Sequence, residues 1–241
     1  MPGSSSVISD NINNINEKVK AAAAKSGRGL SDITILAASK TRSPKEILEA
    51  FNNGIKVFGE NYVQEFLPKI ESLVDYKDIS WHIIGHLQKN KVKYITGKVG
   101  LIHSVDSVLL AKTIEKHSIS QNIVTNILIE VNLAGEKTKN GATIDEAYNL
   151  VKEINKFQGL SLKGLMVMPP LEKNNRKYFK SLRELIKDIN DKNIYKAKLS
   201  TLSMGTSGDF EVAIEEGATI IRLGTIIFGN RPPKNQTRIT N

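Results

Sequence analysis

The chain has 241 residues, of which 40% are hydrophobic, and this is enough apolar material for one large core. It contains no cysteine, which excludes disulfides and cysteine-ligated zinc and favours a reducing compartment, so we expect the protein in the cytoplasm. The net charge is +9, but the sequence has no long basic block and no apolar run of about 18 residues. We therefore expect neither nucleic acid nor a membrane as a partner, and we interpret the densest basic cluster, Lys89, Lys91 and Lys93, as an exposed helix surface.

The first predicted element is an amphipathic helix that ends near the glycines at 27 and 29. Its apolar residues recur at helical spacing and are Ile8, Ile12, Ile15 and Val19. The residues before it, 1–7, are predicted to form a flexible leader, and residues 232–241 at the other end a flexible tail.

A strand followed at once by helix-start signals comes next, and it carries the most informative residue of the chain. The predicted strand 33–40 ends in Lys40, and then Ser43 is placed as an N-cap, Pro44 at the first helical position and Glu46 as the capping-box partner. Lys40 is thus expected at the C-terminal edge of a strand, where ligands bind in α/β proteins. A lysine held among apolar neighbours can lose its proton and attack a carbonyl, whereas a solvated loop lysine is the alternative.

Seven more strand segments alternate with segments of helical periodicity. Several of them are apolar without alternation, as expected for parallel strands buried on both faces. The eight predicted strands cover residues 33–40, 56–61, 81–87, 101–105, 126–133, 162–168, 199–204 and 219–228. Between the fifth and the sixth, Thr143 and Glu146 form a second capping box.

This element order predicts an α/β fold with a single (β/α)8 barrel over residues 8–231. A doubly wound open sheet is the alternative. It is disfavoured because no G-x-G-x-x-G follows the first strand and no linker divides the chain.

In such a barrel the residues at the C-terminal ends of the strands meet at one rim, however far apart they are in sequence. We expect the pocket at this rim to be lined in part by His86, Met168 and Met204. The full set of predicted rim residues is Lys40, Asn61, His86, Asn132, Met168 and Met204.

Two segments near the end of the barrel suit a phosphate group. The turn 202–209 is rich in glycine and hydroxyl groups and contains Ser207, and the segment 221–225 contains Gly224 and Thr225. Glycines let backbone N–H groups approach closely, hydroxyls donate hydrogen bonds, and in many barrels the loops after strands seven and eight hold phosphate. Ordinary tight-turn chemistry is the alternative.

Charged and basic residues at the predicted rim leave several interpretations open. Arg222 lies within an apolar strand, so it must meet an acid, a ligand or water. Glu60 could be a general base, although a rim or capping carboxylate is favoured. His82 and His86 lie roughly 13 Å apart on one strand face, too far to share a metal ion, and we predict no metal site.

A nucleophilic lysine facing a phosphate cradle permits two chemistries. One is Schiff-base aldolase or isomerase action on a sugar phosphate, and the other is capture of pyridoxal 5′-phosphate. Both form an imine, so the residue types alone leave the choice open.

Six ordered blocks of the sequence decide between these chemistries by resemblance. They are residues 37–41 (AASKT), 58–62 (FGENY), 81–91 (WHIIGHLQKNK), 164–166 (GLM), 202–205 (LSMG) and 222–229 (RLGTIIFG). In this order the blocks resemble the YggS/PROSC family of pyridoxal phosphate homeostasis proteins, and the match runs from about residue 8 to residue 231. The resemblance implies a fold-type III barrel similar to the N-terminal domain of alanine racemase.

The resemblance also implies roles for individual residues. Lys40 would carry pyridoxal phosphate as an internal aldimine, Asn61 would line the pyridine ring, and Arg222 would face the ring nitrogen. The residues implied to hold the phosphate are Ser207, Gly224 and Thr225. Two positions depart from the family pattern: Thr206 stands where methionine is frequent, and Ile226 replaces a smaller residue.

Family members are regarded as carriers or regulators of the cofactor pool with no established reaction, and pyridoxal phosphate-dependent apoenzymes are the implied recipients. An arginine at the ring nitrogen cannot accept its proton, so the ring would drain electrons poorly, and this supports a weak catalyst. We expect a monomer without the second domain that completes the racemase site. The alternatives are a racemase or lyase of the same fold and a Schiff-base sugar-phosphate aldolase.

Overall fold

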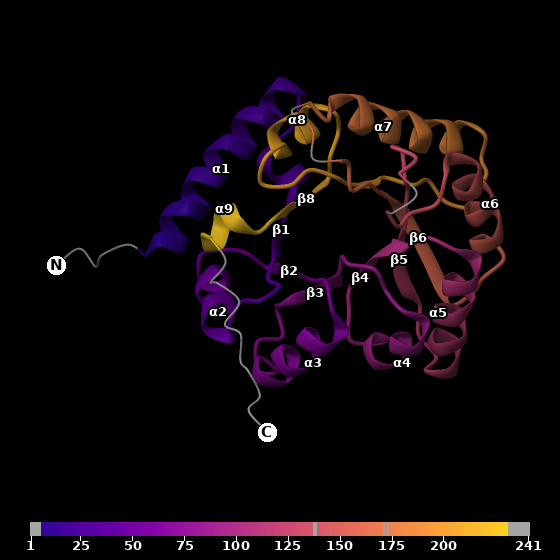
Figure 1. Ribbon diagram of the computed structural model, residues 1–241, viewed down its shortest axis with the longest axis horizontal. Helices are drawn as coiled ribbons and strands as arrows, with labels where there is room; N and C mark the ends of the chain where they lie inside the picture. Colours follow the sequence, from indigo (N-terminus) through magenta and orange to yellow (C-terminus); the bar gives the residue numbers. More distant parts are fainter. Residues whose placement is uncertain (1–5, 137–138, 171, 173, 231–241) are drawn as a thin grey trace.

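The computed structural model describes residues 6–136, 139–170, 172 and 174–230. Eight parallel strands pair in sequence order, and the sheet closes because β1 also pairs with β8 (Figure 1). The predicted (β/α)8 barrel is therefore confirmed and the open sheet is wrong. The strands are β1 (Thr34–Ala38), β2 (Val57–Glu60), β3 (Ser80–Ile83), β4 (Leu101–Val105), β5 (Thr125–Glu130), β6 (Leu160–Met166), β7 (Thr201–Ser203) and β8 (Ile220–Leu223).

Helices surround the barrel and begin at the caps that the sequence predicts. Ser43 accepts a hydrogen bond from the N–H of Glu46 at the start of α2, and Thr143 does the same for Glu146 at α6. The α-helices are α1 (Val7–Lys25), α2 (Pro44–Asn52), α3 (Val63–Ser72), α4 (Val92–Ile95), α5 (Val108–Ser120), α6 (Ile144–Ile154), α7 (Arg176–Asp191), α8 (Phe210–Glu215) and α9 (Thr225–Phe228). Two 3₁₀-helices, η1 (Leu30–Asp32) and η2 (Lys89–Lys91), complete the set.

Several strands end earlier than predicted. Lys40 lies two residues beyond β1, and the predicted strand 219–228 is in fact β8 followed by Gly224 and the short helix α9. The reason is that a strand ends where the neighbouring strand stops offering hydrogen bonds, and this cannot be recognised from hydrophobicity. The buried residues Ile227 and Phe228 pack from a helix instead.

The extra helix α1 lies against α8 and α9 (Figure 1). Ser6 caps it by accepting a hydrogen bond from the N–H of Ser9 at 3.2 Å, so the helix begins at Val7 and the predicted leader 1–7 is too long by two residues. Asn11 then donates to the carbonyl of Ile227 at 3.0 Å. The rest of the predicted leader and the whole predicted tail 232–241 lie outside the described residues.

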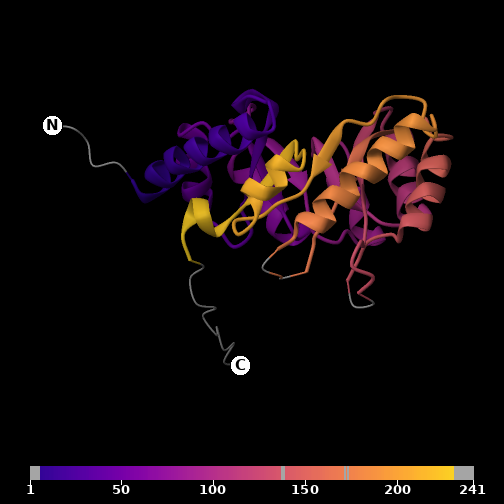
Figure 2. The ribbon, with the colours of Figure 1, turned by 90° about the horizontal axis from the view of Figure 1, so that it is seen from above.

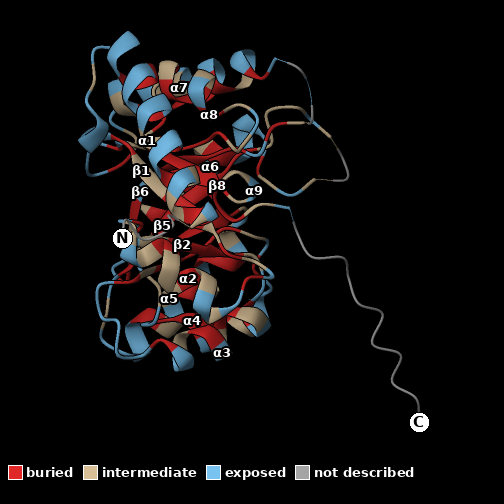
Figure 3. Cartoon of the chain, turned by 90° about the vertical axis from the view of Figure 1, so that its left-hand side faces the viewer, coloured by how far each residue is buried: buried red, intermediate tan, exposed pale blue. Residues whose placement is uncertain are grey.

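Buried side chains form two apolar clusters, one between the strands and the helices and a smaller one inside the barrel. The strands are mostly buried, whereas the helices alternate between buried and exposed residues (Figure 3). The inner cluster consists of Leu36, Ile84, Leu101, Leu128, Met166 and Ile220. The remaining interior is polar, because His82, His103, Ser203 and Arg222 are also buried there and hydrogen-bond to one another.

The segments that follow β5 and β6 leave the barrel on the side where α9 lies (Figure 2). This is the C-terminal end of the strands, where barrel enzymes and binding proteins build their sites. No helix in the described part of the chain is long and apolar enough to cross a membrane.

Candidate functional site

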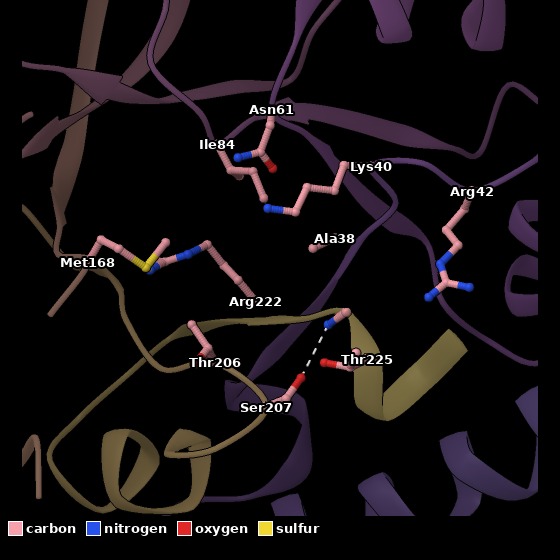
Figure 4. Close-up of a pocket in the computed structure, with 11 residues that line it drawn as sticks. Ala38, Lys40, Arg42, Asn61, Ile84, Met168, Thr206, Ser207, Arg222 and Thr225 are labelled. Carbon is pink, nitrogen blue, oxygen red and sulfur yellow. Dashed lines mark hydrogen bonds between the residues drawn. The ribbon is translucent and has the colours of Figure 1, made fainter. Parts of the chain in front are cut away.

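A cavity of about 330 Å³ opens at the C-terminal ends of the strands, between the loops after β1 and β8 (Figure 4). It brings together all the residues that were implied to bind a cofactor, although they are spread from position 40 to position 225. The lining residues are Ala38, Lys40, Arg42, Asn61, Ile84, Met168, Thr206, Ser207, Arg222, Gly224 and Thr225.

Lys40 is half-buried, and its side chain extends into the cavity toward Asn61 and Ile84 (Figure 4). The next residue, Thr41, has a φ of 66°, a left-handed conformation that is uncommon for a residue other than glycine. The N–H of Thr41 donates to Glu65 Oε2 at 2.8 Å. A side chain from α3 therefore fixes the turn that aims Lys40 inward.

The residue before Lys40 is held by a buried ion pair. Lys69 Nζ lies 2.7 Å from Glu60 Oε1 and donates to the carbonyl of Ser39, also at 2.7 Å. The hydroxyl of Ser39 donates to the same Glu60 oxygen at 2.6 Å. Burial raises the pKa of Glu60, and the Lys69 ammonium and the hydrogen bonds oppose that rise.

Glu60 is the last residue of β2 and so lies at the predicted rim, but its side chain is fully buried and paired with Lys69. Lys69 was missed altogether. One signal in the sequence could have found it: Lys69 continues the three-residue spacing of the buried residues Val63 and Phe66 and so lies on the inner face of α3.

The opposite side of the cavity consists of the turns after β7 and β8. The N–H of Gly224 donates to the hydroxyl oxygen of Ser207 at 3.4 Å, which joins the two turns (Figure 4). Thr206 is oriented differently, because both its N–H (2.6 Å) and its hydroxyl (3.1 Å) donate to Asp209 Oδ1. This side therefore presents short hydroxyls and backbone N–H groups, which suit a phosphate.

Arg222 forms the floor of the cavity. Its Nη1 donates to Ser203 Oγ at 2.7 Å, and its Nη2 donates to the carbonyl of Val167 at 2.8 Å. The Nε atom is buried and has no hydrogen-bond partner among the described residues. Burial lowers the pKa of Arg222 to about 10, while Glu130 and Asp209 oppose the shift, so the side chain stays charged at neutral pH.

A chain of hydrogen bonds leads from Arg222 through the barrel interior. Ser203 Oγ lies 2.9 Å from His103 Nδ1, His103 Nε2 lies 2.9 Å from His82 Nδ1, and His82 Nε2 lies 3.3 Å from Ser80 Oγ. Because a guanidinium can only donate, Ser203 accepts from Arg222 and its own O–H is available to donate to His103 Nδ1. In that arrangement His103 Nε2 donates to His82 Nδ1 and His82 Nε2 donates to Ser80 Oγ. Burial lowers the pKa of His82 to about 4, so this imidazole is neutral at neutral pH and adds no second positive charge to the barrel interior.

Of the three other residues expected to line the pocket, one does so. Met168 lines the cavity, and its sulfur lies 3.8 Å from Arg222 Nη2. Met204 is fully buried among the outer apolar residues, because Ser203 faces the barrel interior and alternation along β7 turns the next side chain outward. His86 lies in the loop after β3, with its Nδ1 3.6 Å from Asp106, and lines two neighbouring cavities instead.

Some residues of the cavity were not predicted. Ala38 could have been found, because it lies two positions before Lys40 in the predicted strand 33–40, in which alternation puts both residues on one face. No sequence pattern indicates Arg42, which donates to the carbonyl of Gly229 at 2.6 Å and to that of Phe228 at 3.3 Å. Arg42 thereby ties the loop that carries Lys40 to the end of α9.

Comparison with known proteins yields similar sequences and similar structures. The sequence profile of the family described as "Alanine racemase, N-terminal domain" matches residues 9–232. A pyridoxal phosphate homeostasis protein of Aquifex aeolicus is 47% identical over 225 residues, which cover 92% of this chain and 97% of that protein.

Among solved structures, PipY of Synechococcus elongatus with PLP bound has a TM-score of 0.81 and 28% identity, covering 92% of this chain and 100% of PipY. An alanine racemase of Clostridium difficile has a TM-score of 0.70 at 16% identity, covering 93% of this chain and 56% of the racemase. This last likeness shows the fold alone.

Proposed function

We propose, from the premise that this chain belongs to the family of pyridoxal phosphate homeostasis proteins, that it is a reversible carrier of pyridoxal 5′-phosphate and holds the cofactor through an imine on Lys40. The observation that carries the proposal is the convergence in one cavity of Lys40, the Ser207–Gly224 contact and the unpartnered Nε–H of Arg222. The PLP bound to PipY, a protein of the same fold, supports the choice of cofactor.

The residues of the cavity fit this cofactor group by group. Lys40 offers an amine for its aldehyde, and the turns at Ser207 and Gly224 offer hydroxyl and N–H donors for its phosphate. The buried Nε–H of Arg222 lacks an acceptor, and an aromatic ring nitrogen is an acceptor of the right kind. When bound, pyridoxal phosphate supplies an aldehyde that forms an imine with a primary amine and a ring that withdraws electrons.

The surroundings of Arg222 support a role in holding the cofactor over a role in catalysis. Its guanidinium can donate a hydrogen bond to the ring nitrogen but cannot accept a proton from it, so the ring stays uncharged. The acceptors Ser203 and Val167 fix the guanidinium in this orientation. The aldolase alternative loses its candidate base, because Glu60 is paired with Lys69 and does not line the cavity.

Delivery of the cofactor extends the same proposal. The homeostasis role in the names of the relatives supports pyridoxal phosphate-dependent apoenzymes as recipients. A monomeric state and a cytoplasmic location remain predictions from the sequence.

Titration of the purified chain with pyridoxal phosphate tests the proposal. We expect an imine absorption band with the wild type and with Lys45→Ala, which removes an exposed lysine of α2. With Lys40→Ala we expect no imine band but weaker, non-covalent binding through the turns at Ser207 and Gly224. An undiminished imine band in Lys40→Ala would contradict the proposal.

A further inference from the structure

A second cavity, of about 400 Å³, adjoins the cofactor cavity at Asn61. Segments after β2 and β3 and the loop between β5 and α6 form it, and Asn61 lines both cavities. The segment after β3 packs directly on this residue: a Cβ at Gly85 would lie 2.5 Å from the carbonyl oxygen of Asn61. The two cavities are therefore held in a fixed relation by a contact that requires glycine.

Apart from Val63 and Gly85, the described residues that line the second cavity are polar or basic, and none of them is Asp or Glu. Lys91 is half-buried there and forms no ion pair with any described residue, and its ammonium lies 5.9 Å from the ring centre of Tyr94. Hydroxyl, amide and imidazole groups line the same cavity, from Tyr62, Gln64, His86, Gln88 and Asn140. A cavity lined by an ammonium and by hydrogen-bond donors is an arrangement that binds a carboxylate.

A nearby acidic residue, Asp106, lines a different cavity. Asp106 Oδ2 lies 3.6 Å from His86 Nδ1, and Asp106 lines a neighbouring cavity with His86 and Lys89. Lys91 and Lys89 thus differ in surroundings although both belong to η2. The interpretation of this cluster as a helix surface holds for Lys93, which is exposed, and does not account for Lys91.

The position of Lys40 indicates which end of the cofactor meets the second cavity. The amine of Lys40 lies beside Asn61 and Ile84, whereas Ser207 and Thr225 lie on the opposite side of the cofactor cavity (Figure 4). A cofactor anchored at Lys40 with its phosphate at Ser207 therefore has its reactive end near Asn61. The second cavity begins at that residue.

We propose that the second cavity is a carboxylate subsite in which Lys91 binds the α-carboxylate of an amino acid whose amine displaces Lys40 from the cofactor. This inference rests on the proposed function. In the exchange, the neutral amine of the amino acid bonds to the carbon of a protonated imine, the bond from that carbon to Lys40 Nζ breaks, and one proton passes from the incoming nitrogen to Nζ. The products are a protonated imine of the amino acid and the neutral amine of Lys40. No oxidant or further reactant is needed. An amino acid can thus release the cofactor from Lys40 as an imine adduct.

Two stable ligands isolate the carboxylate. N-(5′-phosphopyridoxyl)-L-alanine and N-(5′-phosphopyridoxyl)ethylamine differ only in the carboxylate, and neither can react with Lys40. We expect calorimetric titration of the cofactor-free chain to show about tenfold tighter binding of the alanine compound. Lys91→Ala and Lys91→Met should both abolish this preference, Lys91→Arg should retain it, and the control Lys93→Ala should leave it unchanged.

The outcomes separate the subsite from the proposed function. Equal binding of the two ligands to the wild type, or a preference that survives in both Lys91→Ala and Lys91→Met, overturns the subsite alone. Failure of both ligands to bind the wild type overturns the proposed function and the subsite with it. Unfolding curves of the variants establish that each one is folded before titration.

Discussion

The two sides of the cofactor cavity are held in place by different kinds of interaction. On the Lys40 side, the buried ion pair of Glu60 and Lys69 and the carboxylate of Glu65 fix the backbone before and after the lysine. On the Ser207 side, the contacts are made by hydroxyls, backbone N–H groups and glycine turns. The reacting amine is thus positioned by a few buried charges, whereas the phosphate side depends on several weaker contacts.

This difference predicts that one substitution on the Lys40 side has a larger effect than one on the Ser207 side. Lys69→Met leaves the charge of Glu60 buried without a partner, and we expect the free energy of unfolding to fall by about 3–5 kcal/mol. Denaturant titration measures this loss. Lys180→Met, which removes an exposed lysine of α7, should change stability by less than about 0.5 kcal/mol.

Replacing both members of the pair sharpens the same test. In Lys69→Met/Glu60→Gln no charge is left buried without a partner, so most of the lost stability should return. A loss below about 1 kcal/mol in the single variant would show that the Lys40 side does not depend on buried charge.

Glu130 on β5 is a second buried carboxyl and differs from Glu60 in its partners. Glu60 is paired with Lys69, whereas Glu130 has no ion pair within 4 Å among the described residues. Burial raises its pKa to about 7, with Asp106 adding to the rise and Arg222 opposing it. Between about pH 4.3, where an unfolded glutamate titrates, and pH 7, the folded state binds more protons than the unfolded state. The stability that this group contributes is therefore present below about pH 4.3 and lost as the pH rises through 7.

Glu130→Gln removes this titration. We expect Glu130 to lower the unfolding free energy of the wild type by on the order of 2 kcal/mol between pH 5 and pH 8. The variant should lack this contribution to the pH dependence. An identical pH dependence in the two proteins would contradict the assignment.

A backbone test of the Ser207 side is Gly205→Ala. Gly205 has a φ of 92°, and an added Cβ would lie 2.6 Å from the Cβ of Ala213, so we expect a loss of about 1–2 kcal/mol in unfolding free energy. Gly208→Ala is the matched control, because nothing lies within 4 Å of the added atom. Equal losses at the two glycines would remove the special role of the turn at 205.

The smallest expected effect belongs to one hydroxyl of the phosphate side. Ser207→Ala removes the acceptor of the Gly224 N–H and a donor to phosphate, and we expect the Kd for pyridoxal phosphate to rise about two- to tenfold while the imine band persists. Ser120→Ala, at the end of α5, should leave the Kd unchanged. A hundredfold rise in the Kd of Ser207→Ala would show that binding on the Ser207 side depends on this one hydroxyl.

The barrel could be predicted because its evidence is local. Apolar runs marked all eight strands, and the capping boxes at Ser43 and Thr143 fixed the starts of two helices. The ends of the strands could not be predicted, because they depend on where the neighbouring strand stops pairing. For this reason the apolar run predicts one strand over residues 219–228, although the segment contains Gly224 and α9.

The site was predictable to the extent that barrel topology brings strand ends together, which placed Lys40, Arg222 and Ser207 in one cavity. The supporting residues were predictable only in part. The spacing of Lys69 after Val63 and Phe66 indicates the inner face of α3, but it does not indicate the pairing with Glu60. His103 acquires its role only through contacts with Ser203 and His82, which are far from it in sequence, and no local pattern records such contacts.

Borohydride reduction of the chain loaded with pyridoxal phosphate, followed by peptide mass mapping, tests the central claim most directly. Reduction converts an imine into a stable amine, so the mass of the cofactor marks the lysine that held it. We predict the added mass on the peptide that contains Lys40 and on no other peptide. A label on other lysines with Lys40 unmodified would contradict the assignment of Lys40 as the anchor.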